Sequence, residues 1–295
     1  MTTPADTTPT RRGSTADVTV VVASRNRRAD LLASLPRHEA PVILVDNAST
    51  DGTVEAVRAA HPHVRVLPQP RNLGAEGRTV GVARALTPFV AFADDDSWWA
   101  PGDLGRAVEI MRAHPRLAVL VARVLVGPEQ RLDPVCAQMA ASPLGTPADL
   151  PGPALLGFIA CGALVRAEAF TAVGGFDPVV RFPGEEERLA LDLAAVGWGM
   201  SYVDSVTVHH HPSRARHSRA ERQAAIWRSR LLTAVMRLPW ADVLGTGREA
   251  LAAGPPGRAG IRRALPDIPA ALRRRRVVPS SVLGDLHSLR VADRT

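Results

Sequence analysis

Three consecutive carboxylates, Asp94, Asp95 and Asp96, directly follow an apolar run. Adjacent negative charges repel one another, so a chain that concentrates them needs a stabilising partner. Carboxylate oxygens are preferred ligands of Mg²⁺ and Mn²⁺, and Mg²⁺ is commonly held by one or two carboxylates together with substrate phosphates. The run therefore favours a divalent-cation site. The alternative is a solvated acidic turn in which Asp96 or Ser97 caps the next helix.

Two further clusters carry groups that bind metals or move protons. Three histidines occupy residues 209–211. Successive side chains of an extended segment point to opposite faces, so we expect one histidine to join the cation of the aspartate cluster, the alternative being an exposed strand end. Three glutamates at residues 185–187 open a helical pattern. They supply either a general base at the helix mouth or charges that suit the helix dipole.

Shorter polar segments offer contacts for a nucleotide. Asp46-Asn47 follows an apolar run directly, where a carboxylate can accept a hydrogen bond from a base or a ribose hydroxyl; the alternative is a capping turn. Asn72 and Gly74 precede Arg78. The glycine permits close approach of the backbone, and the guanidinium can pair with a phosphate, the alternative being a surface loop.

The elements that must position these groups alternate along the chain. Apolar, β-branched runs predict strands at residues 18–23, 42–45, 64–67, 89–93 and 117–126, with helices at 28–35, 54–60, 76–85 and 104–113. This alternation predicts an α/β fold with a mainly parallel central sheet flanked by helices. In such sheets ligands bind beyond the carboxyl ends of the strands. Because the polar segments at 24–26, 46–47 and 94–96 fall at such ends, we expect them to converge.

The alternation stops after Gly127. Residues 128–153 are proline-rich and predict an irregular loop that closes over a ligand. Further on we expect strands at 159–166 and 200–208, helices at 168–173 and 186–196, and a helix ending near Leu238. The predicted organisation is a disordered lead-in at residues 1–16, one α/β domain at 17–238 and an Arg/Pro-rich extension at 239–295.

The composition limits the kinds of molecule that we expect the protein to bind. The chain has 295 residues and a formal charge of +7, yet it contains no lysine, a pattern typical of GC-rich coding as much as of selected basicity. Aromatic residues make up 4%, and we find no nucleic-acid reading module, so we expect no nucleic-acid partner. Two cysteines without metal-site spacing and an N-terminus without an apolar signal segment favour a cytoplasmic location.

Taken in their order along the chain, the polar and apolar segments described above resemble those of the family 2 glycosyltransferases, which are inverting enzymes of the GT-A nucleotide-sugar fold. The matching segments lie within residues 18–213 and read VTVVVASRNR, VILVDNASTDGT, RNLGAEGRTVG, FVAFADDDSWWAPGDL, ACGALVRAEAFTAVGGFDP with GEEERLALDL, and SVTVHHHPS. The resemblance implies transfer of a sugar from a nucleoside-diphosphate-sugar, of the UDP or dTDP type, to an acceptor hydroxyl. It also implies bound Mn²⁺ or Mg²⁺.

The resemblance assigns roles to individual positions. Those expected at the nucleotide-sugar are Ala23, Ser24, Arg25, Asp46, Asn47, Asn72, Gly74 and Arg78. The metal-binding DxD motif falls on Asp94, Asp95 and Asp96, with Asp96 as the principal ligand and the other two near the ribose and the metal. The acidic catalytic pair falls on Glu185 and Glu186, of which we assign Glu186 as the base. The late histidine of the family matches His210 by its spacing to Ser213, with His209 as the second choice.

Two positions depart from the pattern of the family. Glu186 stands where the catalytic pair usually ends in Asp, and Thr79-Val80 stands where Arg-Asn is frequent. Two other functions on related scaffolds are a non-catalytic nucleotide-sugar-binding protein and a Mg²⁺-dependent sugar nucleotidyltransferase. The segment SRNRR lacks the glycines of the phosphate loop that a nucleotidyltransferase usually carries.

The C-terminal extension suggests a separate contact. Residues 261–278 (IRRALPDIPAALRRRRVV) mix arginine clusters with apolar residues, a combination that suits the surface of an anionic membrane and a lipid-linked acceptor. The alternatives are a solvated basic tail and a contact within a homodimer. The sequence leaves open whether the acceptor hydroxyl belongs to a polysaccharide, a lipid carrier, a protein or a small molecule.

Overall fold

The computed structural model describes residues 14–213 and 218–292. Most of the expected disordered lead-in, residues 1–13, lies outside the described residues. The described strands form one nine-stranded sheet in the order β3-β2-β1-β4-β8-β6-β9-β5, with β7 paired to β6. This mostly parallel α/β architecture is the one that the alternation of strands and helices predicts.

The N-terminal half of the sheet is parallel. Strand β1 (Val18–Ser24) lies between β2 (Val42–Asp46) and β4 (Phe89–Ala93), and β3 (Arg65–Pro68) pairs with β2. Every residue of β2 and β4 is buried, so both faces of the sheet are covered. The connecting helices are α1 (Arg28–Ser34), α2 (Thr53–Ala60) and α3 (Glu76–Val82).

The C-terminal half mixes directions. Strand β8 (Ala163–Arg166) is antiparallel to β4 on one side and to β6 (Leu117–Val126) on the other. Strand β9 (Gly199–His210) runs parallel to β6 and pairs with the short β5 (Ser97–Trp99). Helices α4 (Asp103–Ala113), α6 (Ala167–Ala172) and α7 (Glu185–Ala195) belong to this half. The strand expected at 159–166 begins only at Ala163, after a 3₁₀ turn, and β9 extends two residues past Val208 to include His209 and His210.

The expectation of a wholly irregular loop at residues 128–153 was wrong. This segment contains β7 (Arg131–Leu132) and helix α5 (Pro134–Ala140). The Asp133 side chain accepts a hydrogen bond from the Val135 amide at 2.9 Å, and Pro134 occupies the first helical position, where its missing N–H costs nothing. The proline that suggested a loop is therefore a helix-start signal.

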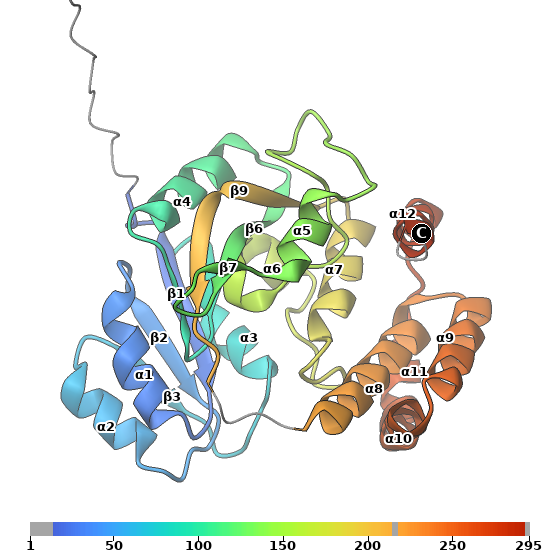
Figure 1. Ribbon diagram of the computed structural model, residues 1–295, viewed down its shortest axis with the longest axis horizontal. Helices are drawn as coiled ribbons and strands as arrows, with labels where there is room; N and C mark the ends of the chain where they lie inside the picture. The colour runs from blue at the N-terminus through green and yellow to red at the C-terminus, as the bar shows by residue number, and fades with distance from the viewer. Residues whose placement is uncertain (1–13, 214–217, 293–295) are drawn as a thin grey trace, which may run out of the picture.

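The C-terminal helices form a group beside the sheet (Figure 1). They are α8 (Arg219–Arg237), α9 (Trp240–Ala252), α10 (Pro255–Ala264), α11 (Ile268–Arg273) and α12 (Ser280–Ala292). Helix α8, expected within the α/β domain, shares a buried apolar cluster with α10 and α11, to which Val179 and Val180 also belong. Arg237 donates to Asp192 of α7 at 3.0 Å, a partly buried ion pair that fixes this group to the sheet domain.

Within the described part of the chain, we find no helix with the length and hydropathy that a bilayer-crossing segment requires.

We predict that Gly81→Ala destabilises the protein. Gly81 packs α3 against β1, where an added Cβ would overlap Cγ1 of Val21. Forcing extra volume into a packed contact costs about 1–3 kcal/mol. Gly247→Ala is the matched control, because open space surrounds that helical glycine and the change should be neutral or stabilising. Urea denaturation measures both, and equal midpoints would contradict the packing argument.

Candidate active site

The three aspartates after β4 point to different partners. Asp94 Oδ1 accepts from Arg78 Nη2 at 2.5 Å. Asp95 Oδ2 accepts from the Ser24 hydroxyl at 2.7 Å, and Asp96 Oδ2 accepts from the Ser213 amide at 3.0 Å. All three carboxylates are half-buried. The repulsion within the run is therefore relieved by separating the charges among α3, β1 and the segment that follows β9.

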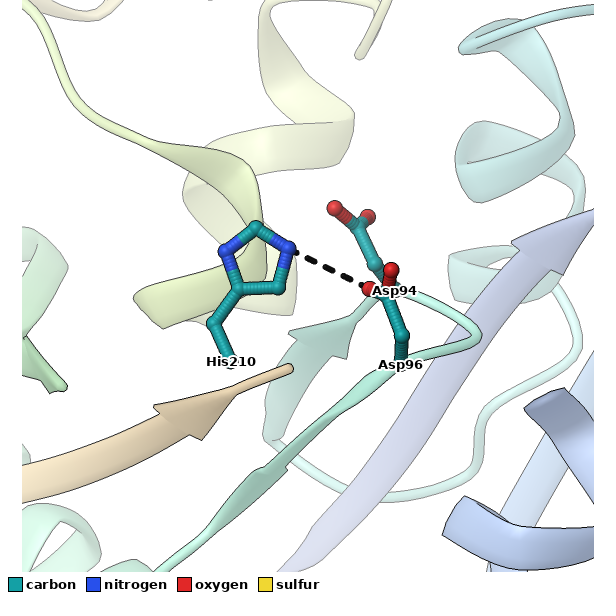
Figure 2. A group of neighbouring side chains, drawn as sticks. All are labelled: Asp94, Asp96 and His210. Atoms are coloured by element: carbon teal, nitrogen blue, oxygen red, sulfur yellow. Dashed lines mark ion pairs between the residues drawn. The ribbon is translucent and has the colours of Figure 1, made fainter. Parts of the chain in front are cut away.

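A group able to hold a metal ion lies at this point. Asp94, Asp96 and His210 each offer one ligand atom, and these atoms lie within 4.8 Å of one another (Figure 2). His210 Nε2 is 3.2 Å from Asp96 Oδ1, the pair joined by the dashed line in Figure 2. The two carboxylate oxygens are ligands of the kind that Mn²⁺ and Mg²⁺ prefer, and the imidazole nitrogen would add a third ligand to a bound ion.

The structure separates the neighbouring histidines by strand geometry. His210 lies opposite Ser97 in the β5–β9 ladder, whereas His209 lies opposite Trp98 and stacks on its ring at a centroid distance of 5.7 Å. His211 also contacts Trp98, at 4.8 Å. Because side chains alternate along a strand, only His210 faces the aspartates. His209, the second choice from the sequence, lies outside the group.

The carboxyl group of Asp95 has a raised pKa. Burial raises its pKa to about 7, the charges of Asp96 and Asp94 add to that rise, and the hydrogen bond from Ser24 opposes it. The Asp95 backbone carbonyl also accepts from the Ser34 hydroxyl at 2.7 Å. Both the side chain and the main chain of Asp95 are thus fixed by serines, which orients the two aspartates that flank it.

Arg78 is the cation at the centre of the acidic cluster. Its guanidinium is buried and lies 3.5 Å from Glu185 Oε1 in addition to its contact with Asp94. Burial lowers the pKa of Arg78, but the charges of Asp94 and Glu185 outweigh this effect and raise it. For Glu185, burial and then the neighbouring charge of Glu186 raise the pKa to about 8, while Arg78 opposes the rise. Arg78 therefore bridges the start of α7 and the end of β4.

The three glutamates at the start of α7 diverge. Glu185 is fully buried against Arg78. Burial raises the pKa of Glu187, and the charges of Arg230 and Arg290 in the C-terminal helices oppose that rise. Glu186 is half-buried, and burial is the main cause that raises its pKa, with the charge of Asp94 adding to it. Of the three, Glu186 combines partial exposure with proximity to the aspartate cluster.

The carboxyl ends of β1 and β2 form the other side of the site. Ser24 and Asp46 are register partners at these ends, and both are buried. Asp46 Oδ2 accepts from the Ser49 amide at 3.0 Å, while Oδ1 is buried without a hydrogen-bond partner among the described residues. A buried carboxylate oxygen left in this way favours a donor group on a ligand. Ala23 is half-buried nearby, whereas Arg25 is exposed on the following loop.

Two of the residues expected to contact a nucleotide-sugar, Asn47 and Asn72, make hydrogen bonds to the loop before α3 in the structure. Asn47 donates to the Gly74 carbonyl at 3.1 Å and accepts from the Leu73 amide. The Asn72 side chain accepts from the Gly74 amide at 2.8 Å, and Gly74 has a φ of +59°, which suits glycine. Asn47 and Asn72 therefore shape the loop that leads to Arg78.

Three further hydrogen-bonding side chains of this region were not predicted to belong to the site. Ser97 Oγ accepts from the Asp94 amide at 2.8 Å, and its position three residues after Asp94 is typical of a local turn contact. Ser34 lies far from the aspartates in sequence, so only the fold could identify it. Thr79, a departure from the family pattern, accepts from the Phe176 amide at 2.9 Å and ties α3 to the chain before α7.

A mostly parallel α/β sheet that gathers carboxylates and a histidine at its strand ends, with an arginine of α3 beside them, is the arrangement expected of a GT-A type glycosyltransferase. The chain belongs to glycosyl transferase family 2, whose family model matches residues 19–174. It is 28% identical over 207 residues to the N-acetylglucosaminyl-diphospho-decaprenol L-rhamnosyltransferase of Mycobacterium tuberculosis, a match that covers 59% of this chain and 67% of that protein. It is also 28% identical to the pre-mycofactocin glycosyltransferase of the same organism, of which it spans 44%.

Solved structures agree on the fold. The mannosyltransferase PcManGT from Pyrobaculum calidifontis, in complex with GDP-Man and Mn²⁺, superposes with a TM-score of 0.56 at 21% identity, over 94% of this chain and 75% of that one. TarS 1-349 from S. aureus, in complex with UDP-GlcNAc, gives 0.57 at 17% identity, over 94% and 88%. The expectations of the family, of the GT-A fold and of a glycosyltransferase are confirmed.

We predict that Arg78 and Glu185 are energetically coupled. Arg78→Met leaves two carboxylates without their shared counter-charge, which should lower the free energy of unfolding by about 3 kcal/mol. In a Glu185→Gln background the same change should cost at least about 1 kcal/mol less. Denaturant unfolding of the four proteins gives the coupling energy.

Arg116→Met is the matched control for this cycle. Arg116 pairs with Asp149 at the exposed surface, where solvent screens the ion pair and its loss should leave the stability almost unchanged. If the effects of the Arg78 and Glu185 substitutions on the free energy of unfolding were additive, the predicted coupling between the two residues would be contradicted.

Proposed function

We propose that the protein is an inverting, divalent-metal-dependent glycosyltransferase that moves a sugar from a nucleoside-diphosphate-sugar to an acceptor hydroxyl. The observation that carries the proposal is the placement of Asp94, Asp96 and His210 at one point, with Arg78, Glu185 and Glu186 beside them. A leaving diphosphate needs positive charge, and an attacking hydroxyl needs a base. This site supplies candidates for both within one cluster.

Asp94, Asp96 and His210 are the residues that would hold the cation. A bound divalent ion supplies Lewis-acid stabilisation of the charge that develops on a departing diphosphate. The Mn²⁺ in the mannosyltransferase complex supports this assignment by analogy of fold. Arg78 is a second source of positive charge, because its guanidinium contacts Asp94 and lies within the same cluster. The preorganised charges need no reorientation during the reaction, which is where electrostatic catalysis gains most.

The nucleoside is proposed to lie along the ends of β1 and β2. Asp46 has a buried oxygen available to a base N–H or a ribose hydroxyl. Ala23 and Ser24 lie at the end of β1, the strand between Asp46 and the aspartates, and Ser24 donates to Asp95. Arg25 is exposed on the loop that follows β1, and it is the side chain that we propose contacts a bound nucleotide from that loop. In this arrangement the donor would extend from the carboxyl end of β2 to the cation site, and its sugar would lie at the start of α7.

Glu186 is the proposed base. Glu185 is the poorer candidate because its side chain is fully buried and engaged with Arg78. Glu186 is partly exposed, and its raised pKa makes the carboxylate a stronger proton acceptor than an ordinary glutamate. Single displacement with inversion requires one base and no covalent nucleophile, which agrees with this assignment.

The named relatives suggest which donors to test first. The rhamnosyltransferase of M. tuberculosis transfers L-rhamnose by its name, so a nucleoside-diphosphate-rhamnose is the first candidate and a diphospho-polyprenol-linked sugar the first acceptor. The experiment is a panel of UDP-, dTDP- and GDP-sugars with Mn²⁺, read by thermal shift and then by product mass. A donor that raises the melting temperature and yields a glycosylated acceptor supports the function. Pyrophosphate release from a nucleoside triphosphate without sugar transfer would favour a nucleotidyltransferase instead.

We predict that Asp96→Asn weakens Mn²⁺ binding at least about tenfold, because the variant loses a charged ligand. Calorimetric titration of the full chain measures the affinity. His209→Ala is the matched control, since its ring packs on Trp98 away from the aspartates. Unchanged Mn²⁺ affinity in Asp96→Asn, or an equal loss in His209→Ala, would overturn the assignment.

We predict that Glu186→Gln lowers kcat about 10²–10⁴-fold while the Kd of the donor stays the same. The base acts in its ionised form, so activity should fall as the pH drops through its pKa. Because that pKa is raised, the fall should occur above the ordinary range of a glutamate near pH 4.3. Glu187→Gln is the control and should retain turnover. A Glu186→Gln enzyme with normal kcat would move the base elsewhere.

A further inference from the structure

The C-terminal helices carry the whole positive excess of the chain. Residues 219–292 contain fourteen arginines and five acidic residues, which gives +9, whereas the entire chain carries +7. Several of these arginines are used internally, among them Arg228 with Asp267, Arg237 with Asp192 and Arg290 with Asp242. Arg248, Arg258 and Arg262 are exposed and form no ion pair with any residue in the ranges 14–213 and 218–292.

Exposed apolar side chains lie along the same helices. Trp240, Leu244 and Leu251 are 56%, 62% and 55% exposed, and their spacing of four and seven residues places them on one face of α9. Arg248 falls on that face as well. Arg275 lies over the Trp240 ring at 4.1 Å, which holds the indole in place.

Helix α10 continues this face. Gly257 lies against the Ala250 carbonyl of α9 and Gly260 against Trp227 of α8, so α10 packs through its small residues. Arg258 and Arg262 lie one turn apart on the side of α10 that faces away from these glycine contacts. Together with Leu251 and Ile261 they line a hollow of ≈ 530 Å³ between α9 and α10. Leu265, 60% exposed, lies one turn further on. We call the side chains of Trp240, Leu244, Arg248, Leu251, Arg258 and Arg262 the α9–α10 surface.

We propose that the α9–α10 surface binds the headgroup region of an anionic lipid bilayer. A helix face that combines tryptophan and leucine with arginine is suited to lie in the plane of such an interface, with apolar groups among the acyl chains and guanidinium groups at the phosphates. A nucleic acid would satisfy the arginines but not the exposed leucines. A second copy across a two-fold axis would bring unpaired arginines against each other.

This proposal goes beyond the proposed function and does not depend on it. The test is flotation of the full chain with vesicles of phosphatidylcholine alone or mixed with phosphatidylglycerol. We expect binding to the mixed vesicles only, weakening as salt rises because the attraction is screened. Asp96→Asn should bind vesicles like the unmodified chain, so a failure of the catalytic assignment leaves this result intact.

Two double variants locate the contact. Arg258→Gln with Arg262→Gln should weaken binding about fivefold for each arginine removed, and Leu244→Ser with Leu251→Ser should also weaken it. The matched controls are Arg58→Gln with Arg84→Gln and Leu86→Ser, which change exposed residues of the sheet domain and should leave binding unchanged. Circular dichroism and the melting temperature confirm folding of each variant.

Several outcomes overturn the proposal. One is equal binding to both vesicle types, and another is equal loss in the controls. Binding to an oligonucleotide but not to vesicles would assign the surface to nucleic acid. A concentration-dependent dimer that Leu244→Ser with Leu251→Ser abolishes, without any vesicle binding, would assign it to a second copy of the chain.

Discussion

The site depends on the pairing of one buried cation with several carboxylates. Arg78 contacts Asp94 and Glu185, and its guanidinium opposes the rise in pKa that burial causes for Glu185 and Glu186. Without Arg78, the pKa values of the two glutamates would rise further, and their carboxylates would lose charge. The position of α3 against β1, which presents Arg78, is therefore as important to the chemistry as the acidic residues themselves.

The two halves of the sheet contribute different parts of the site. The parallel half ends in Ser24, Asp46 and the aspartates, so its groups arise from adjacent strands with the same direction. The mixed half delivers His210 from the end of β9, which the short β5 holds beside the aspartate run. The strand order thus joins the edge proposed for the nucleotide to the point proposed for the metal ion, and α7 contributes Glu185, which contacts Arg78.

Much of this could be predicted because local patterns determine it. Buried strands that end in polar residues identified Ser24, Asp46 and the aspartates, and strand alternation identified a single histidine. The remaining features depend on tertiary contacts. The Ser34 contact and the Glu185–Arg78 pair join residues 61 and 107 positions apart. Helix α5 was missed because a proline at a helix start and a proline in a loop look alike in a composition-based analysis.

The hydrogen bonds of Asp96 link the site to the chain that leads into the C-terminal helices. Its carbonyl accepts from the His211 amide at 2.9 Å and its carboxylate from the Ser213 amide at 3.0 Å. A ligand that binds the Asp96 carboxylate competes with the Ser213 amide for it. The hydrogen bond from the His211 amide to the Asp96 carbonyl is not affected. Amide exchange at Ser213 is consequently a local reporter of occupancy, with His211 as an internal reference on the same loop.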